Sequence, residues 1–213
     1  MHTPKPLLAL LLAASVSMAQ AEPLKIGLIL PLTGPFASTG KQIEAGARLY
    51  MAQQGNTVAD RKVELIVKDD TGVADVTKRM AQELVVNDKV GVLAGFGLTP
   101  LAMATAPIAT QSKTPLVVMA AATSSITEAS PYIVRTSFTV PQVVTTLADW
   151  ASANNIRKVV TLVTDYAPGV DSEKYFNQRF TTNGGVVVES LRVPLRSPDF
   201  APFLQKVRDA KHD

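Results

Sequence analysis

The 213-residue sequence contains no cysteine, and its only two histidines are His2 and His212. Without cysteine there is no disulfide, no thiolate nucleophile and no thiolate metal site. With histidine confined to the two ends, a Ser/His/Asp triad, a histidine proton shuttle and a histidine-rich metal site are all disfavoured. The residue types therefore argue against an enzyme, and we expect neither a metal nor a cofactor.

The net charge is also small, because 21 Lys and Arg against 18 Asp and Glu leave only +3. The basic residues occur as isolated pairs, as is typical of ordinary solvated faces. A nucleic-acid surface requires a basic cluster or stripe, and the sequence has neither. We therefore expect no nucleic-acid partner.

Long apolar runs are lacking as well, apart from residues 7–14. This run follows Lys5 and precedes the small residues Ala19 and Ala21, which is the pattern of a secretory signal peptide cleaved before Glu22. It is only about half as long as a membrane-spanning helix must be. No cysteine follows it to carry a lipid, so we expect a soluble periplasmic protein without a membrane anchor. A buried N-terminal helix is the alternative interpretation.

Strand-like and helix-like segments alternate through the rest of the sequence. Short apolar runs predict strands, and the amphipathic segments between them predict helices. Strands separated by helices of this length imply βαβ units, in which parallel sheets are covered on both faces. The expected strands are residues 24–30, 63–67, 90–94, 116–119, 133–135, 159–163 and 185–191, and the expected helices are residues 42–54, 74–87, 101–111, 140–154, 172–182 and 200–211.

The irregular stretch 136–141 predicts a boundary between two such units. We accordingly divide the sequence into a signal peptide (1–21), an N-terminal lobe (22–137) and a partial second lobe (138–213). The second unit has only two clear strands, which are too few to bury a two-faced sheet well. We therefore expect a longer polypeptide that completes this lobe.

Two short motifs admit a chemical interpretation beside a structural one. Asp69 and Asp70 follow a predicted strand and would suit metal or acid–base chemistry, although capping of the next loop and helix is the favoured interpretation. The segment 95–97 (GFG) resembles a dinucleotide-binding loop, but Pro100 occupies the place of its third glycine. Neither motif therefore predicts a cofactor site.

Three loops that leave predicted strands and open predicted helices carry the binding hypothesis. Residues 95–100 place Thr99 at the expected N-cap and Pro100 at the first helical position. Residues 120–125 offer small side chains and three hydroxyls, and residues 164–169 offer an aromatic ring. Free N–H groups at a helix start suit a carboxylate, and open α/β sheets bind ligands at the carboxyl ends of their strands. Plain capping and turn chemistry is the alternative for each loop.

A series of motifs follows the signal peptide in a specific order: KIGLILPLTGPFASTGKQIEAGARL, VELIVKDDTG, AGFGLTPLAMATAPIA, TPLVVMAAATSSIT and VTLVTDYAPG. Together they resemble the solute-binding proteins of branched-chain amino-acid-type ABC importers, a subset of the type I periplasmic binding proteins. The resemblance covers residues 24–213. It implies an α/β fold with two lobes, each a parallel sheet flanked by helices, joined by a hinge and closing on a ligand. Members of this family are considerably longer, which again implies that the second lobe is incomplete.

The resemblance also assigns ligand contacts in the first lobe. Thr99 matches the hydroxyl residue that holds the ligand carboxylate. Thr123 matches a residue whose hydroxyl and amide hold polar groups of the ligand, and Gly97 and Ala121 match backbone contacts.

Departures from the family pattern bear on the ligand. Thr39 stands where the branched-chain amino-acid binders have an aromatic cleft residue, so that wall is altered. Pro168 replaces a tyrosine for which Tyr166 is the expected substitute, and the acidic residue that holds a ligand ammonium is expected beyond Asp213. These differences, and the loop sequences GFGLTP and AAATSSIT, resemble members that capture aromatic or other organic carboxylates.

We therefore expect the periplasmic solute-binding component of an ABC importer, acting with an inner-membrane permease. Its ligand is expected to be a small carboxylate-bearing solute, either a branched-chain amino acid or an aromatic or other organic acid. A ligand-sensing domain of the same fold that feeds a receptor needs the same cleft and stays open as an alternative. An exported α/β enzyme is the third and less favoured hypothesis.

We predict that signal peptidase cleaves after Ala21, because Ala19 and Ala21 are the small residues that the enzyme reads. N-terminal sequencing of the protein from a periplasmic extract should therefore begin at Glu22. A cytoplasmic protein that retains Met1 would contradict the prediction.

Overall fold

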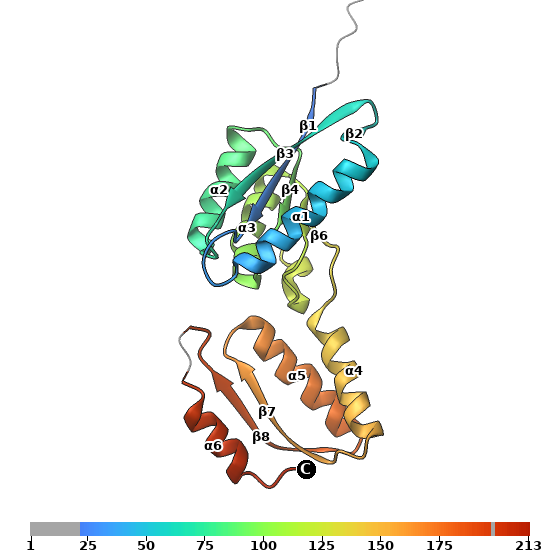
Figure 1. The fold of residues 1–213 in the computed structure, drawn as a ribbon, viewed down its shortest axis with the longest axis vertical. Coiled ribbons are helices and arrows are strands. Elements are labelled where there is room, and N and C mark those ends of the chain that lie inside the picture. The colour runs from blue at the N-terminus through green and yellow to red at the C-terminus, as the bar shows by residue number, and fades with distance from the viewer. Residues whose placement is uncertain (1–21, 197–198) are drawn as a thin grey trace, which may run out of the picture.

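The computed structural model describes residues 22–196 and 199–213, which form two α/β lobes (Figure 1). The predicted signal peptide, residues 1–21, lies outside the described residues. A six-stranded sheet forms the first lobe and a two-stranded sheet the second. The chain leaves the first sheet after Arg135, two residues before the predicted boundary at residue 137, and that boundary stays a prediction.

Every strand and helix expected from the sequence is present; β1 and β6 have the expected bounds, and the other elements are shifted at one or both ends. The first lobe contains β1 (Leu24–Leu30), α1 (Ala37–Gln54), β2 (Thr57–Val58), β3 (Arg61–Asp69), α2 (Ala74–Val86), β4 (Val92–Gly95), α3 (Thr99–Ser112), β5 (Leu116–Val118), the 3₁₀ helix η1 (Ser124–Glu128) and β6 (Ile133–Arg135). The second lobe contains α4 (Val140–Ala153), β7 (Lys158–Thr164), α5 (Ala167–Thr182), β8 (Val186–Val193) and α6 (Ala201–Asp209). The short elements β2 and η1 were not expected.

The expected starts of α1 at residue 42 and α5 at residue 172 are both wrong, since the helices begin at Ala37 and Ala167. The first turn of each helix is built from small residues or proline, which have no helical apolar period. In α5, Pro168 occupies the first turn, where its missing N–H costs nothing. At position 169 a Cβ atom would lie 1.8 Å from the carbonyl oxygen of Thr164, so only glycine permits this close turn.

The first sheet has the strand order β2-β3-β1-β4-β5-β6. All pairs are parallel except β2–β3, which is an antiparallel hairpin. After β1, the strand β3 is added on one side of it, and the next strand, β4, is added on the other side. The order therefore reverses between β1 and β4, and such a switch point opens a crevice at the carboxyl ends of the strands. In Figure 1 these ends face the second lobe.

Alternation along β1 divides the first lobe into two apolar layers. Ile29 belongs to the larger core, which α2 and α3 cover with buried side chains such as Leu84 and Leu101. Leu28 and Leu30 point to the other face, where α1 packs. Helix α1 covers that face incompletely and leaves an apolar groove of about 500 Å³.

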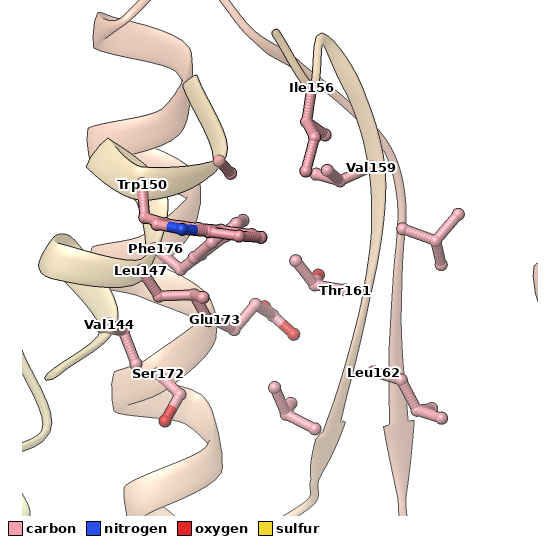
Figure 2. Close-up of a pocket in the computed structure, with 13 residues that line it drawn as sticks. Val144, Leu147, Trp150, Ile156, Val159, Thr161, Leu162, Ser172, Glu173 and Phe176 are labelled. Carbon is pink, nitrogen blue, oxygen red and sulfur yellow. The ribbon is translucent and has the colours of Figure 1, made fainter. Parts of the chain in front are cut away.

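The second lobe packs α4 and α5 against the parallel pair β7–β8. Its core centres on Phe180, which is fully buried and contacts Ala148 and Ala151 of α4. A further apolar cavity of about 340 Å³ lies between the helices and β7, with Trp150 and Phe176 projecting toward the strand (Figure 2). The helix layer and the sheet are therefore not in full contact here, and Trp150 is 57% exposed.

We predict that Phe180→Ala lowers the free energy of unfolding of the second lobe by about 3–5 kcal/mol, because it removes the largest side chain of that core. Trp150 is the only tryptophan in the sequence, so its fluorescence during urea unfolding reports on this lobe. Phe200→Ala in the same lobe is the matched control, since Phe200 is 48% exposed and its loss should cost under about 0.5 kcal/mol. Equal effects of the two substitutions would contradict the assigned core.

Candidate functional site

The candidate site begins with the turn that follows β4. Gly95 has φ +116° and the fully buried Phe96 has φ +66°, so the chain reverses sharply where the strand ends. A Cβ atom on the following Gly97 would lie 2.9 Å from Cγ of Pro31, the residue after β1. Gly97 therefore sits at the switch point of the sheet, where the loops after β1 and β4 approach each other.

This turn brings Thr99 to the residue expected to share its ligand. The hydroxyl oxygens of Thr99 and Thr123 lie 2.8 Å apart in a hydrogen bond, and the two residues are only 3% and 5% exposed. The structure thus places the two predicted hydroxyl residues side by side, although they are 24 positions apart in the sequence.

The expected N-cap role of Thr99 is wrong. Leu98 occupies the N-cap in extended backbone geometry, and Thr99 is the first residue of α3. The hydroxyl of Thr99 bonds to Thr123, so it makes no capping bond to the helix. Pro100 accordingly stands second in the helix, where its missing N–H is still tolerated.

Backbone hydrogen bonds connect the loop that carries Thr123 both to the loop after β4 and to the start of α4. The amide of Ala121, a residue that is 3% exposed, donates to the carbonyl of Phe96 at 3.1 Å. The amide of Val140, at the start of α4, donates to the carbonyl of Ala122 at 2.9 Å. The loops after β4 and β5 are therefore joined to each other and to the first helix of the second lobe.

Charged side chains bind both ends of the peptide group that links Thr123 to Ser124. Nη2 of Arg135 donates to the Thr123 carbonyl at 2.6 Å. The Asp171 carboxylate, from α5 of the second lobe, accepts from the Ser124 amide at 2.7 Å and from its hydroxyl at 3.0 Å. Burial lowers the pKa of Arg135, and the charge of Asp171 opposes this. Nε and Nη1 of Arg135 are buried without a hydrogen-bond partner in residues 22–196 and 199–213.

The other two predicted contacts, Thr39 and Tyr166, belong to helix starts in different lobes. Thr39 is exposed in the first turn of α1. Tyr166 is the N-cap residue of α5 and is half-buried, and this burial raises the pKa of its phenol. Within the described parts of the chain, no hydrogen bond joins either residue to Thr99 or Thr123.

The expectation that Asp69 and Asp70 cap the next loop is confirmed, but the expected cap on the next helix is wrong, because Val73 is the N-cap residue of α2 and, within the described residues, no side chain caps that helix start. Asp69 accepts hydrogen bonds from the Thr33 hydroxyl and from the amides of Leu32 and Thr71, and these bonds lower its pKa although burial opposes them. Asp70 is fully buried and accepts from the amide of Gly72 and the hydroxyl of Thr77. Burial raises the pKa of Asp70 against those bonds.

An opening of about 420 Å³ lies between the two lobes. It is lined in the first lobe by the loops after β1 and β3 and in the second by the residues after β8, namely Pro35, Phe36, Thr71, Gly72, Val73, Leu195 and Arg196. Each of these loops begins at the carboxyl end of a parallel strand and leads toward the following helix. In the same described residues, no group of three or more acidic or histidine side chains is arranged to hold a metal, and no helix is long and apolar enough to cross a membrane.

The sequence interpretation missed Arg135 and Asp171. An arginine that ends a short apolar strand and an acidic residue near the start of a helix are both weak signals, because such residues usually face solvent. Ser124 was recognised only as one of three hydroxyls in its loop. Its partnership with Asp171 spans 47 positions and depends on how the lobes meet.

Comparison with known proteins places the chain in a family. Residues 23–213 match the family described as periplasmic binding protein. A curated relative, the "Leu/Ile/Val-binding protein homolog 6" of Brucella abortus (strain 2308), is 48% identical over 197 residues, which is 92% of this chain and 50% of the relative. The chain therefore spans about half the length of the curated relatives it matches.

Two solved structures resemble the fold closely. One is the solute-binding protein of an ABC transporter from Rhodopseudomonas palustris BisB5 in complex with 3,4-dihydroxybenzoic acid, with a TM-score of 0.86 and 59% identity over 90% of this chain and 53% of that one. The other, from R. palustris HaA2 in complex with p-hydroxybenzoic acid, has a TM-score of 0.87 and 44% identity over 90% of this chain and 52% of that one. With its two α/β lobes and its match over nearly all of residues 22–213, the chain belongs to the periplasmic binding protein family.

Proposed function

We propose that the complete protein is the periplasmic solute-binding component of an ABC importer, and that its ligand is an aromatic carboxylate of the hydroxybenzoate class. The observation that carries this proposal is the buried hydroxyl pair Thr99–Thr123 at the carboxyl ends of two adjacent parallel strands. The two structural relatives in complex with hydroxybenzoates support the ligand class.

The pair suits one carboxylate. When one hydroxyl donates to the other, the acceptor keeps its own proton free to donate outward. Thr99 also begins α3, so its backbone N–H has no partner within the helix and the positive end of the helix dipole lies beside it. A carboxylate placed there accepts a hydrogen bond from the free threonine hydroxyl and another from the backbone N–H at the start of α3.

The second lobe supplies the opposite wall. Tyr166 stands at the start of α5, half-buried, and its ring is the aromatic surface that the loop after β7 offers to an apolar ligand body. Gly97 and Ala121 keep the first-lobe backbone free of bulky side chains where the ligand approaches. Thr39, which is exposed on α1, leaves one side of this cleft open to a ligand wider than a branched-chain amino acid.

Export and an inner-membrane permease partner belong to the same proposal. A sensing role with the same ligand is the second candidate, because a receptor would read the same closed form. Uptake of labelled 4-hydroxybenzoate separates the two: deletion of the gene should abolish uptake if the protein serves transport and leave uptake intact if it serves sensing.

We predict that Thr99→Val and Thr123→Val in the complete protein each weaken binding of 3,4-dihydroxybenzoate by roughly ten- to a hundredfold, the usual cost of a lost hydrogen bond to a charged group. Calorimetric titration measures the change. Because the two hydroxyls bond to each other, the double variant should lose less than the product of the single losses.

Thr105→Val is the matched control for the hydroxyl pair. Thr105 is fully buried in the same helix, and its hydroxyl donates to the carbonyl of Leu101 at 2.6 Å. Thr105→Val should lower the free energy of unfolding about as much as Thr99→Val or Thr123→Val does, and it should leave the affinity for 3,4-dihydroxybenzoate unchanged. Unchanged affinity in both Thr99→Val and Thr123→Val would refute the assigned site.

We further predict that Tyr166→Ala weakens binding of the same probe by about tenfold, while Tyr166→Phe retains it, because the ring and not the phenol packs on the ligand. The melting temperature of the ligand-free protein should change little. Tyr50→Ala is the control, since Tyr50 is 67% exposed on α1. If Tyr166→Ala binds as tightly as the wild type, the loop bounds the cleft without touching the ligand.

A further inference from the structure

The peptide group between Thr123 and Ser124 is held by opposite charges at its two ends. The guanidinium of Arg135 lies on the carbonyl oxygen at 2.6 Å, and the carboxylate of Asp171 lies on the amide nitrogen at 2.7 Å. A peptide group is a dipole with its negative end at oxygen and its positive end at the N–H. Both charges therefore stabilise the same orientation of this one peptide plane.

The two charges come from different lobes. Arg135 ends β6, the edge strand of the first sheet, and pairs in register with Val118 of β5. Asp171 lies in the second turn of α5 and reaches across the lobe boundary to both the amide and the hydroxyl of Ser124. The bond from Arg135 lies within the first lobe, whereas the bonds to Asp171 cross from the first lobe to the second.

The same peptide group bears directly on the ligand site. Thr123 is the residue on its carbonyl side, with φ −58° and ψ 137°, and its hydroxyl bonds to Thr99. Rotation of the peptide plane changes ψ of Thr123 and breaks the bonds to Arg135 and Asp171 together. The orientation of the peptide thus links the contact between the lobes to the backbone of the hydroxyl pair.

We propose that Asp171 is a positioning residue that couples lobe closure to ligand binding by fixing the Thr123–Ser124 peptide across the lobe boundary. This inference rests on the proposed function, because it takes Thr123 as a ligand contact. Closure forms two hydrogen bonds to a carboxylate, and their loss should shift the ratio of closed to open protein by at least tenfold. A ligand that needs the closed form then binds more weakly by about the same factor.

The test measures closure without any ligand. Spin labels at Lys41→Cys in the first lobe and Gln178→Cys in the second, both exposed positions, report the distance between the lobes of the complete protein by pulsed electron paramagnetic resonance. Asp171→Asn should lower the closed population of the ligand-free protein at least tenfold relative to the open one. Ser124→Ala removes only the hydroxyl bond and should give a smaller shift in the same direction.

Asp165→Asn is the matched control, because Asp165 lies in the loop before α5, its side chain is exposed, and among the described residues its carboxylate forms one ion pair, to Arg192 at 3.9 Å. It should leave the distance distribution as in the wild type. In parallel, calorimetry with 3,4-dihydroxybenzoate should show at least tenfold weaker binding for Asp171→Asn and none of this loss for Asp165→Asn.

An unchanged distance distribution in Asp171→Asn overturns the coupling, whatever the affinity. A shifted distribution with unchanged affinity also overturns it, since closure would then not govern binding. If the wild type fails to bind the probe, the proposed ligand class is wrong. The interlobe distances still decide whether Asp171 holds the lobes together.

Discussion

Parallel pairing of β1 with β3 on one side and β4 on the other is the constraint on which the rest of the first lobe depends. It directs the carboxyl ends of all the parallel strands to one edge, so that the loops after these strands face the second lobe (Figure 1). It also sends Ile29 to one apolar layer and Leu28 and Leu30 to the other. Helices must then cover both faces, and the edge at the carboxyl ends of the strands is where open α/β sheets bind ligands.

Polar groups at this edge are buried and therefore need partners. A buried hydroxyl without a hydrogen bond is costly, and Thr99 and Thr123 meet that requirement through each other. The pair thus links the loops after β4 and β5, which the amide of Ala121 also joins. Asp171 adds the second lobe to this arrangement through Ser124, so hydrogen bonds join the loops after β4 and β5 to the second lobe.

The predicted proximity of Thr99 and Thr123 is confirmed, their role in binding a ligand stays a prediction, and the local detail at Thr99 was wrong. The resemblance to the family supplied the two residues, and the structure shows why they meet: they follow β4 and β5, which pair in parallel. The N-cap role of Thr99 failed because Leu98 takes that position and the hydroxyl has a partner from another loop. Arg135 and Asp171 were missed because nothing in their own sequence neighbourhoods distinguishes them from solvent-facing charges.

Local patterns in the sequence determined the alternation of strands and helices, because the apolar periods of 2 and 3.6 residues reflect which side chains must be buried. They also located the three loops between a strand and a helix on which the binding hypothesis rests. Only the tertiary structure decided how α1 and α5 begin, where close contacts with Pro31 and Thr164 select Gly40 and Gly169. It alone joined Arg135, the Thr123–Ser124 peptide and Asp171, because hydrogen bonds between distant residues depend on how the lobes pack and leave no periodic trace in the sequence.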